Sequence, residues 1–125
     1  MFTISLPQTI KFGFGVAKEA GYEARRLGIR RALMVVGPRL AEEVKASLEA
    51  EGIEVRALTR VKIEPDDEAI EEAYRAIKDL EIDGFIALGG GSTIDTAKIL
   101  DLLYTHPAPL ENYINKPVGK GMTPP

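Results

Sequence analysis

The chain has 125 residues, a formal net charge of −3, ordinary globular proportions of hydrophobic (45%) and charged (28%) residues, and no cysteine. A chain of this length is one domain and can bury a real core. The dispersed basic residues suggest neither a nucleic-acid-binding surface nor a surface for anionic membranes. The lack of cysteine excludes disulfides, thiolate catalysis and cysteine-ligated metals. The N-terminus lacks a signal-peptide apolar core and no run approaches the roughly 20 residues of a spanning helix, so we expect a cytoplasmic protein.

The first part of the chain predicts a β-hairpin followed by a helix. Residues 2–6 alternate in polarity and end at Pro7, and residues 10–14 can pair with them. Residues 16–27 are expected to form a helix that Gly28 ends from the C-cap position.

The next segments alternate between strand and helix patterns. Residues 32–36 are continuously apolar, as expected for a strand that is buried on both faces. Apolar residues then recur at helical spacing between residues 40 and 48, and Gly52 ends this helix. Residues 53–58 are a second candidate for a parallel strand.

A loop over residues 59–65 precedes a third strand–helix pair. Asp66 is placed to cap a helix, whose apolar stripe we interpret as core rather than as a ligand site. That stripe consists of Ile70, Tyr74, Ile77 and Leu80. Residues 85–88 predict the third strand, and residues 93–103 the helix that follows it.

This alternation predicts a Rossmann-like, doubly wound, mostly parallel α/β sheet with right-handed crossovers behind the N-terminal hairpin. We expect a dinucleotide-binding domain over residues 1–103. Residues 104–125 contain five prolines and no periodicity, which indicates a loop or an ordered arm.

A run of three glycines, Gly89, Gly90 and Gly91, follows the third strand and opens a helix. Without side chains the backbone can approach a bulky anion, and the first turn of the helix offers N–H groups and a partial positive charge. The alternative is a tight strand-to-helix turn without a ligand. Asp95 and Lys98 share a helix face and could equally form a surface salt bridge.

The decapeptide over residues 89–98, GGGSTIDTAK, closely resembles the GGGSxxDxAK signature of the iron-containing (group III) alcohol dehydrogenases. Residues 12–15 (FGFG) and residues 27–36 are similar to an early turn and to the first parallel strand of that family. Residues 112–121 resemble the hydroxyacid–oxoacid transhydrogenase-like members. The resemblance covers essentially the whole chain and implies a Rossmann-like fold.

The resemblance also implies that the glycine turn holds the pyrophosphate of a nicotinamide cofactor. The implied phosphate contacts are Gly89, Gly90, Gly91 and Ser92, and the motif's charged positions Asp95 and Lys98 are expected to orient the turn and balance charge.

Residue 37 bears on the choice between NADP and NAD. Many NAD-preferring relatives carry an aspartate where this chain has Gly37, and a carboxylate there would repel a 2′-phosphate. Arg39, beyond Pro38, could pair with that phosphate, or could simply be solvated beside a helix start. We therefore count all three residues in the cofactor site and expect NADP to bind at least as well as NAD.

The family binds its catalytic iron or zinc through one Asp and several His in a helical second domain, and none of those positions occurs in this sequence. His106 is the only histidine, and one loop histidine cannot build a metal site. We expect an NAD(P)-binding domain of a metal-dependent dehydrogenase acting on an alcohol or hydroxy acid, inactive as this piece. The alternatives are a non-catalytic nucleotide-binding module, or part of a dehydroquinate-synthase-like or polyol-phosphate dehydrogenase enzyme.

We also expect a homodimer or larger assembly. In the family, further strands follow the third parallel strand, so a sheet that ends there presents unpaired backbone groups. Either this edge or the hairpin over residues 2–14 could mediate the association.

Overall fold

Three parallel strands form one sheet in the order β2-β1-β3. The structure, a computed structural model, describes residues 7–37, 41–59, 65–114 and 119–123. The strands are β1 (Arg31–Val36), β2 (Glu54–Leu58) and β3 (Gly84–Leu88). The α-helices are α1 (Ala20–Arg26), α2 (Ala41–Ala50), α3 (Asp67–Ile77) and α4 (Gly91–Thr105), and the 3₁₀ turns are η1 (Val16–Glu19) and η2 (Leu110–Asn112).

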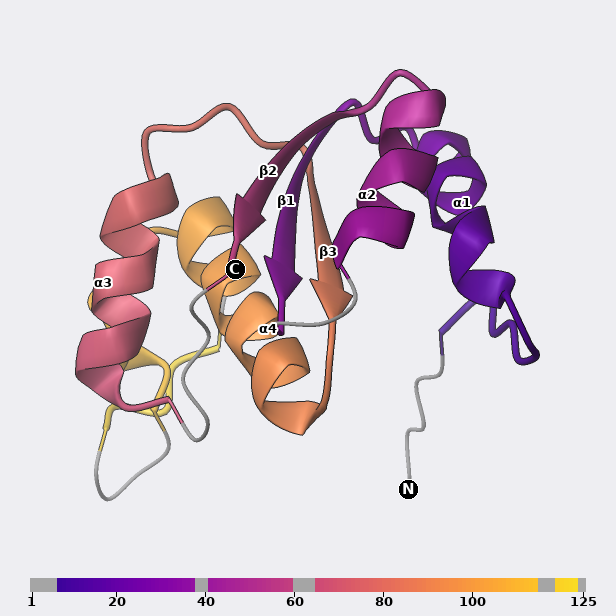
Figure 1. The fold of residues 1–125 in the computed structure, drawn as a ribbon. Helices are drawn as coiled ribbons and strands as arrows, with labels where there is room; N and C mark the ends of the chain where they lie inside the picture. The colour runs from indigo at the N-terminus through magenta and orange to yellow at the C-terminus, as the bar shows by residue number, and fades with distance from the viewer. Residues whose placement is uncertain (1–6, 38–40, 60–64, 115–118, 124–125) are drawn as a thin grey trace.

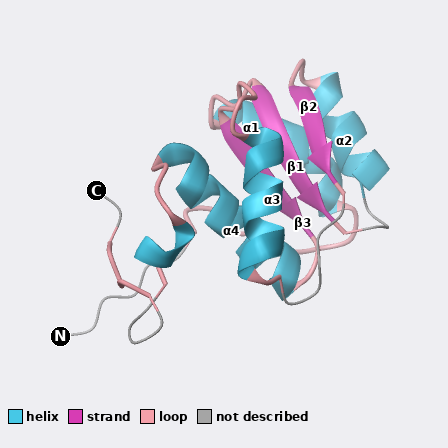
Figure 2. Cartoon of the chain, turned by 90° about the vertical axis from the view of Figure 1, so that its left-hand side faces the viewer, coloured by secondary structure: helices cyan, strands magenta, loops and turns pink. Residues whose placement is uncertain are grey.

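Helices cover both faces of the sheet (Figure 1). On one face, Met34 of β1 packs with Val44 and Leu48 of α2 in a core that also includes residues of α1. On the other face, Leu33 of β1 packs in a core with Leu100 of α4, and Figure 2 views the sheet from this side. Neighbouring side chains of β1 therefore enter opposite cores, which confirms the doubly wound fold.

The central strand explains the continuous apolar run at residues 32–36. Each of these five residues is at most 1% exposed, because β1 has a strand on either side and helices on both faces. Ala32 pairs with Val55 of β2, and Val36 pairs with Leu88 of β3.

The predicted helix ends are confirmed at three residues. Gly28 and Gly52 have φ angles of +84° and +76°, the left-handed conformation in which glycine avoids the steric cost of a Cβ. The Asp66 carboxylate accepts a hydrogen bond at 2.9 Å from the backbone N–H of Ala69, so it caps α3 as expected.

The N-terminal segment differs from the predicted hairpin. Residues 10–14 form no strand, and residues 2–6 lie outside the described residues. The segment is instead connected to η1 and α1 by side chains, because Lys11 pairs with Glu19 of η1 and, at 2.7 Å, with Glu23 of α1. The hydrogen bond with Glu19, and then that with Glu23, raises the pKa of Lys11. These ion pairs involve side chains alone, so they can form without residues 10–14 adopting the extended backbone of a strand.

The predicted arm after residue 103 contains local structure. Helix α4 runs to Thr105, and Tyr104 donates a hydrogen bond to the Leu80 carbonyl and accepts one from the Ile82 N–H. Further along, the N–H of Lys120 donates to the Glu111 carbonyl at 2.9 Å. The domain boundary at residue 103 stays a prediction. None of the described helices is long and apolar enough to cross a membrane.

We expect the chain to self-associate, because β3 has a strand on one side only within the described sheet, while Phe12 and Phe14 are fully exposed. Light scattering at micromolar concentration should report a dimer or a larger species. Replacing both phenylalanines with serine should give a monomer if the N-terminal segment mediates the contact, and should change nothing if the β3 edge does. A monomeric wild-type chain at every concentration would contradict the expectation.

Candidate functional site

The loop after β1 and the glycine turn after β3 begin side by side. Val36 pairs with Leu88 at the carboxyl ends of the two strands, and the next N–H, that of Gly37, donates to the Leu88 carbonyl at 3.1 Å. The structure therefore brings together two of the segments that the sequence analysis assigned to one site, although they are about fifty residues apart in the chain.

This position is also where the winding of the sheet changes direction. The chain leaves β1 through α2 and reaches β2 on one side, whereas β3, reached through α3, lies on the other side of β1. Figure 1 shows α2 and α4 leaving the strand ends on opposite faces of the sheet. In open α/β sheets, the crevice outside the carboxyl ends of the strands at such a point is the usual ligand site.

The three glycines of the turn have different surroundings. A Cβ atom at Gly89 would lie 2.6 Å from the Thr93 hydroxyl oxygen, so this residue is packed against α4. Gly90 is the N-cap of α4 and Gly91 its first residue, and among the described residues a Cβ at either would have no heavy atom beyond its chain neighbours and α4's own backbone within 4 Å. The turn is therefore closed toward the protein at Gly89 and open at Gly90 and Gly91.

The first turn of α4 carries hydrogen-bond donors toward the same opening. The first backbone hydrogen bond of the helix runs from the Ile94 N–H to the Gly90 carbonyl at 3.1 Å. The N–H groups of Gly91 and Thr93 have no hydrogen-bond partner among the described residues. Unpaired N–H groups and the positive end of the helix dipole together favour an anion.

The charged residues of the motif lie on the outer surface of α4. Asp95 and Lys98 are both exposed, and they form no ion pair with each other. The alternative that they are only a surface salt bridge is therefore not supported by the structure. Ser92 is half-buried at the start of the helix. Pro38 and Arg39 lie outside the described residues.

Thr93, which was not predicted from the sequence as part of the site, lies beside the glycine turn. Thr93 is only 7% exposed and its side chain faces Gly89. The sequence could have predicted this contact, because Thr93 falls in the first turn of the helix. Side chains on a helix lean toward its N-terminus, which here is the glycine turn.

The described residues do not fit a metal ion. Within the described part of the chain, no three His, Cys, Asp or Glu side chains come together in a way that could hold one. His106 follows α4 directly, and its N–H donates to the Leu102 carbonyl at the C-terminal end of that helix. It therefore lies at the other end of α4 from the glycine turn.

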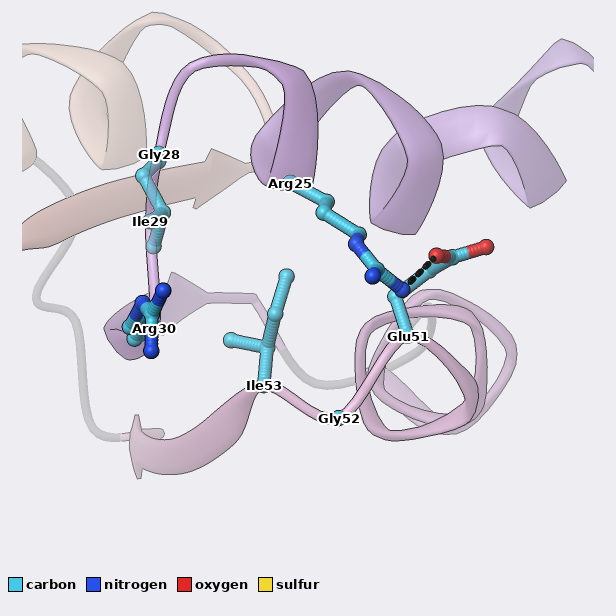
Figure 3. A pocket seen from close by; sticks show the side chains of 7 residues that line it. All are labelled: Arg25, Gly28, Ile29, Arg30, Glu51, Gly52 and Ile53. Carbon is cyan, nitrogen blue, oxygen red and sulfur yellow. Dashed lines mark hydrogen bonds and ion pairs between the residues drawn. The ribbon is translucent and has the colours of Figure 1, made fainter.

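A surface pocket at the amino ends of the strands offers no second candidate (Figure 3). Residues 28–30 lead into β1 and residues 51–53 into β2, so the pocket lies at the opposite end of the sheet from the glycine turn. Its Arg25 is paired with Glu51 at 3.2 Å and lies in the last turn of α1, where a cation is favourable in any case.

Comparison with known families and proteins extends these observations. Residues 7–125 match the family described as iron-containing alcohol dehydrogenase. Among curated relatives, the mitochondrial hydroxyacid-oxoacid transhydrogenase of Bos taurus is 35% identical over 119 residues, which are 90% of this chain and 26% of the relative. The choline dehydrogenase of Bacillus subtilis (strain 168) is 34% identical over 116 residues, which are 89% of this chain and 29% of that protein.

Solved structures share the fold. The NADH-dependent butanol dehydrogenase A of Thermotoga maritima superposes with a TM-score of 0.80 at 27% identity, over 90% of this chain and 30% of that one. An iron-containing alcohol dehydrogenase from Thermococcus thioreducens gives a TM-score of 0.71 at 28% identity, over 83% of this chain and 27% of that one. The chain thus spans about a quarter to a third of the length of these relatives.

Proposed function

Because the chain belongs to the iron-containing alcohol dehydrogenase family, we propose that it is the NAD(P)-binding part of a metal-dependent alcohol dehydrogenase. When bound, the nicotinamide cofactor supplies the hydride chemistry. The residues of this chain bind and orient it.

One observation carries the proposal. The hydrogen bond from the Gly37 N–H to the Leu88 carbonyl holds the end of β1 against the start of the glycine turn, at the point where the winding of the sheet reverses. A dinucleotide needs two adjacent sites, one for its pyrophosphate and one for its adenosine ribose, and these two strand ends supply adjacent places for them.

We assign the pyrophosphate to the open part of the turn. Among the described residues, no side chain approaches a Cβ position at Gly90 or Gly91, and the N–H groups of Gly91 and Thr93 have no partner, so we expect them to be available to phosphate oxygens. Asp95 and Lys98, exposed one turn further along α4, are proposed to orient this turn and to balance its charge. Gly89 and Ser92 complete the proposed contacts.

Isothermal titration calorimetry with NADH and NADPH tests this function. We expect both to bind weakly, because the chain spans only part of the length of its relatives. A folded sample that gives no binding heat with either cofactor at millimolar concentration would contradict the proposal.

The same site leads us to expect that NADP binds at least as well as NAD. No carboxylate stands at Gly37 to repel a 2′-phosphate, and Arg39 is proposed to pair with it. Replacing Gly37 with aspartate tests this, because a Cβ there would meet no heavy atom of the described residues beyond its chain neighbours within 4 Å, so we expect the fold to stay intact.

We expect Gly37→Asp to weaken NADPH binding about tenfold, roughly 1.4 kcal/mol, and to leave NADH binding unchanged or improved. Gly37→Asn, of the same size without the charge, is the control and should affect NADPH less. A wild-type chain that prefers NADH tenfold or more would show that the proposed roles of Gly37 and Arg39 are wrong.

We propose that the metal acts elsewhere in the whole enzyme. No described group of this chain fits a metal ion, so we derive no catalytic step from these residues. Whether the substrate is an alcohol or a hydroxy acid is decided outside this segment. The relatives named above include proteins described for both kinds of substrate.

A further inference from the structure

We draw no further inference here: the strongest candidate, the groove that Phe85, Asp101 and Tyr104 line along the edge of β3 facing away from β1, carries none because nothing in the described part of the chain shows what covers it.

Discussion

Replacing Gly90 with valine should abolish dinucleotide binding without unfolding the protein. Among the described residues, a Cβ at this residue would have no heavy atom within 4 Å apart from its chain neighbours and α4's own backbone. The backbone has φ −82° and ψ −170°, an extended conformation that valine adopts readily. The new side chain would project into the opening where we place the pyrophosphate. We expect affinity for NADH and NADPH to fall by at least about 100-fold, roughly 2.8 kcal/mol.

Gly89→Ala is the informative comparison. Here the added methyl group would meet the Thr93 side chain, with its hydroxyl oxygen at 2.6 Å, so the change strains the protein itself. We expect a loss of about 1–3 kcal/mol in stability, whereas Gly90→Val should cost only about 1 kcal/mol through its poorer N-cap. Thermal unfolding of both variants measures this contrast.

Calorimetry on folded Gly90→Val completes the test. Wild-type affinity in that variant would mean that the ligand does not approach the open face of the turn. Loss of the folded state in Gly90→Val, with Gly89→Ala intact, would mean that the surroundings of the two glycines are opposite to those described.

The sequence predicted the elements whose cause is local. The apolar run at residues 32–36 could only suit a strand covered on both faces, and β1 occupies that place at the centre of the sheet. Gly28, Gly52 and Asp66 act on the helix ends next to them, so their chemistry could be recognised from the sequence. The three helix ends are decided by chemistry within a few residues, and the strand is marked by its own uninterrupted apolar run.

The features that the sequence could not supply depend on contacts between distant residues. The hairpin prediction used the alternation of residues 2–6 and expected residues 10–14 to pair with them. Ion pairs from Lys11 to Glu19 and Glu23 instead connect that segment to the first helical turns, and the polarity pattern of a sequence does not reveal such pairs. The contact between Gly37 and Leu88 exists only because β3 lies beside β1 in the sheet. The packing of the Thr93 side chain against Gly89 is visible only once its surroundings are known.

Residues 1–125 alone should bind the cofactor and yet turn over no alcohol, aldehyde or hydroxy acid. Alcohol oxidation needs a group that polarises the substrate oxygen, which in this family we expect to be a metal ion. The chain has one histidine and no cysteine, and its described residues form no group that fits a metal. A bound nicotinamide then has no activated substrate to exchange hydride with.

The measurement is the change in nicotinamide absorbance with substrate, with and without added Fe²⁺ or Zn²⁺. We expect a rate equal to that of the buffer, and the same rate in the Gly90→Val variant, while calorimetry on the same preparation shows that only the wild type binds NADH. Turnover that survives purification, requires added metal and disappears in Gly90→Val would contradict the prediction, because it would mean that this chain both holds a metal and delivers the cofactor to it. Metal-dependent turnover that Gly90→Val leaves unchanged would instead point to a contaminating enzyme, since the variant removes the site through which this chain is proposed to hold the cofactor.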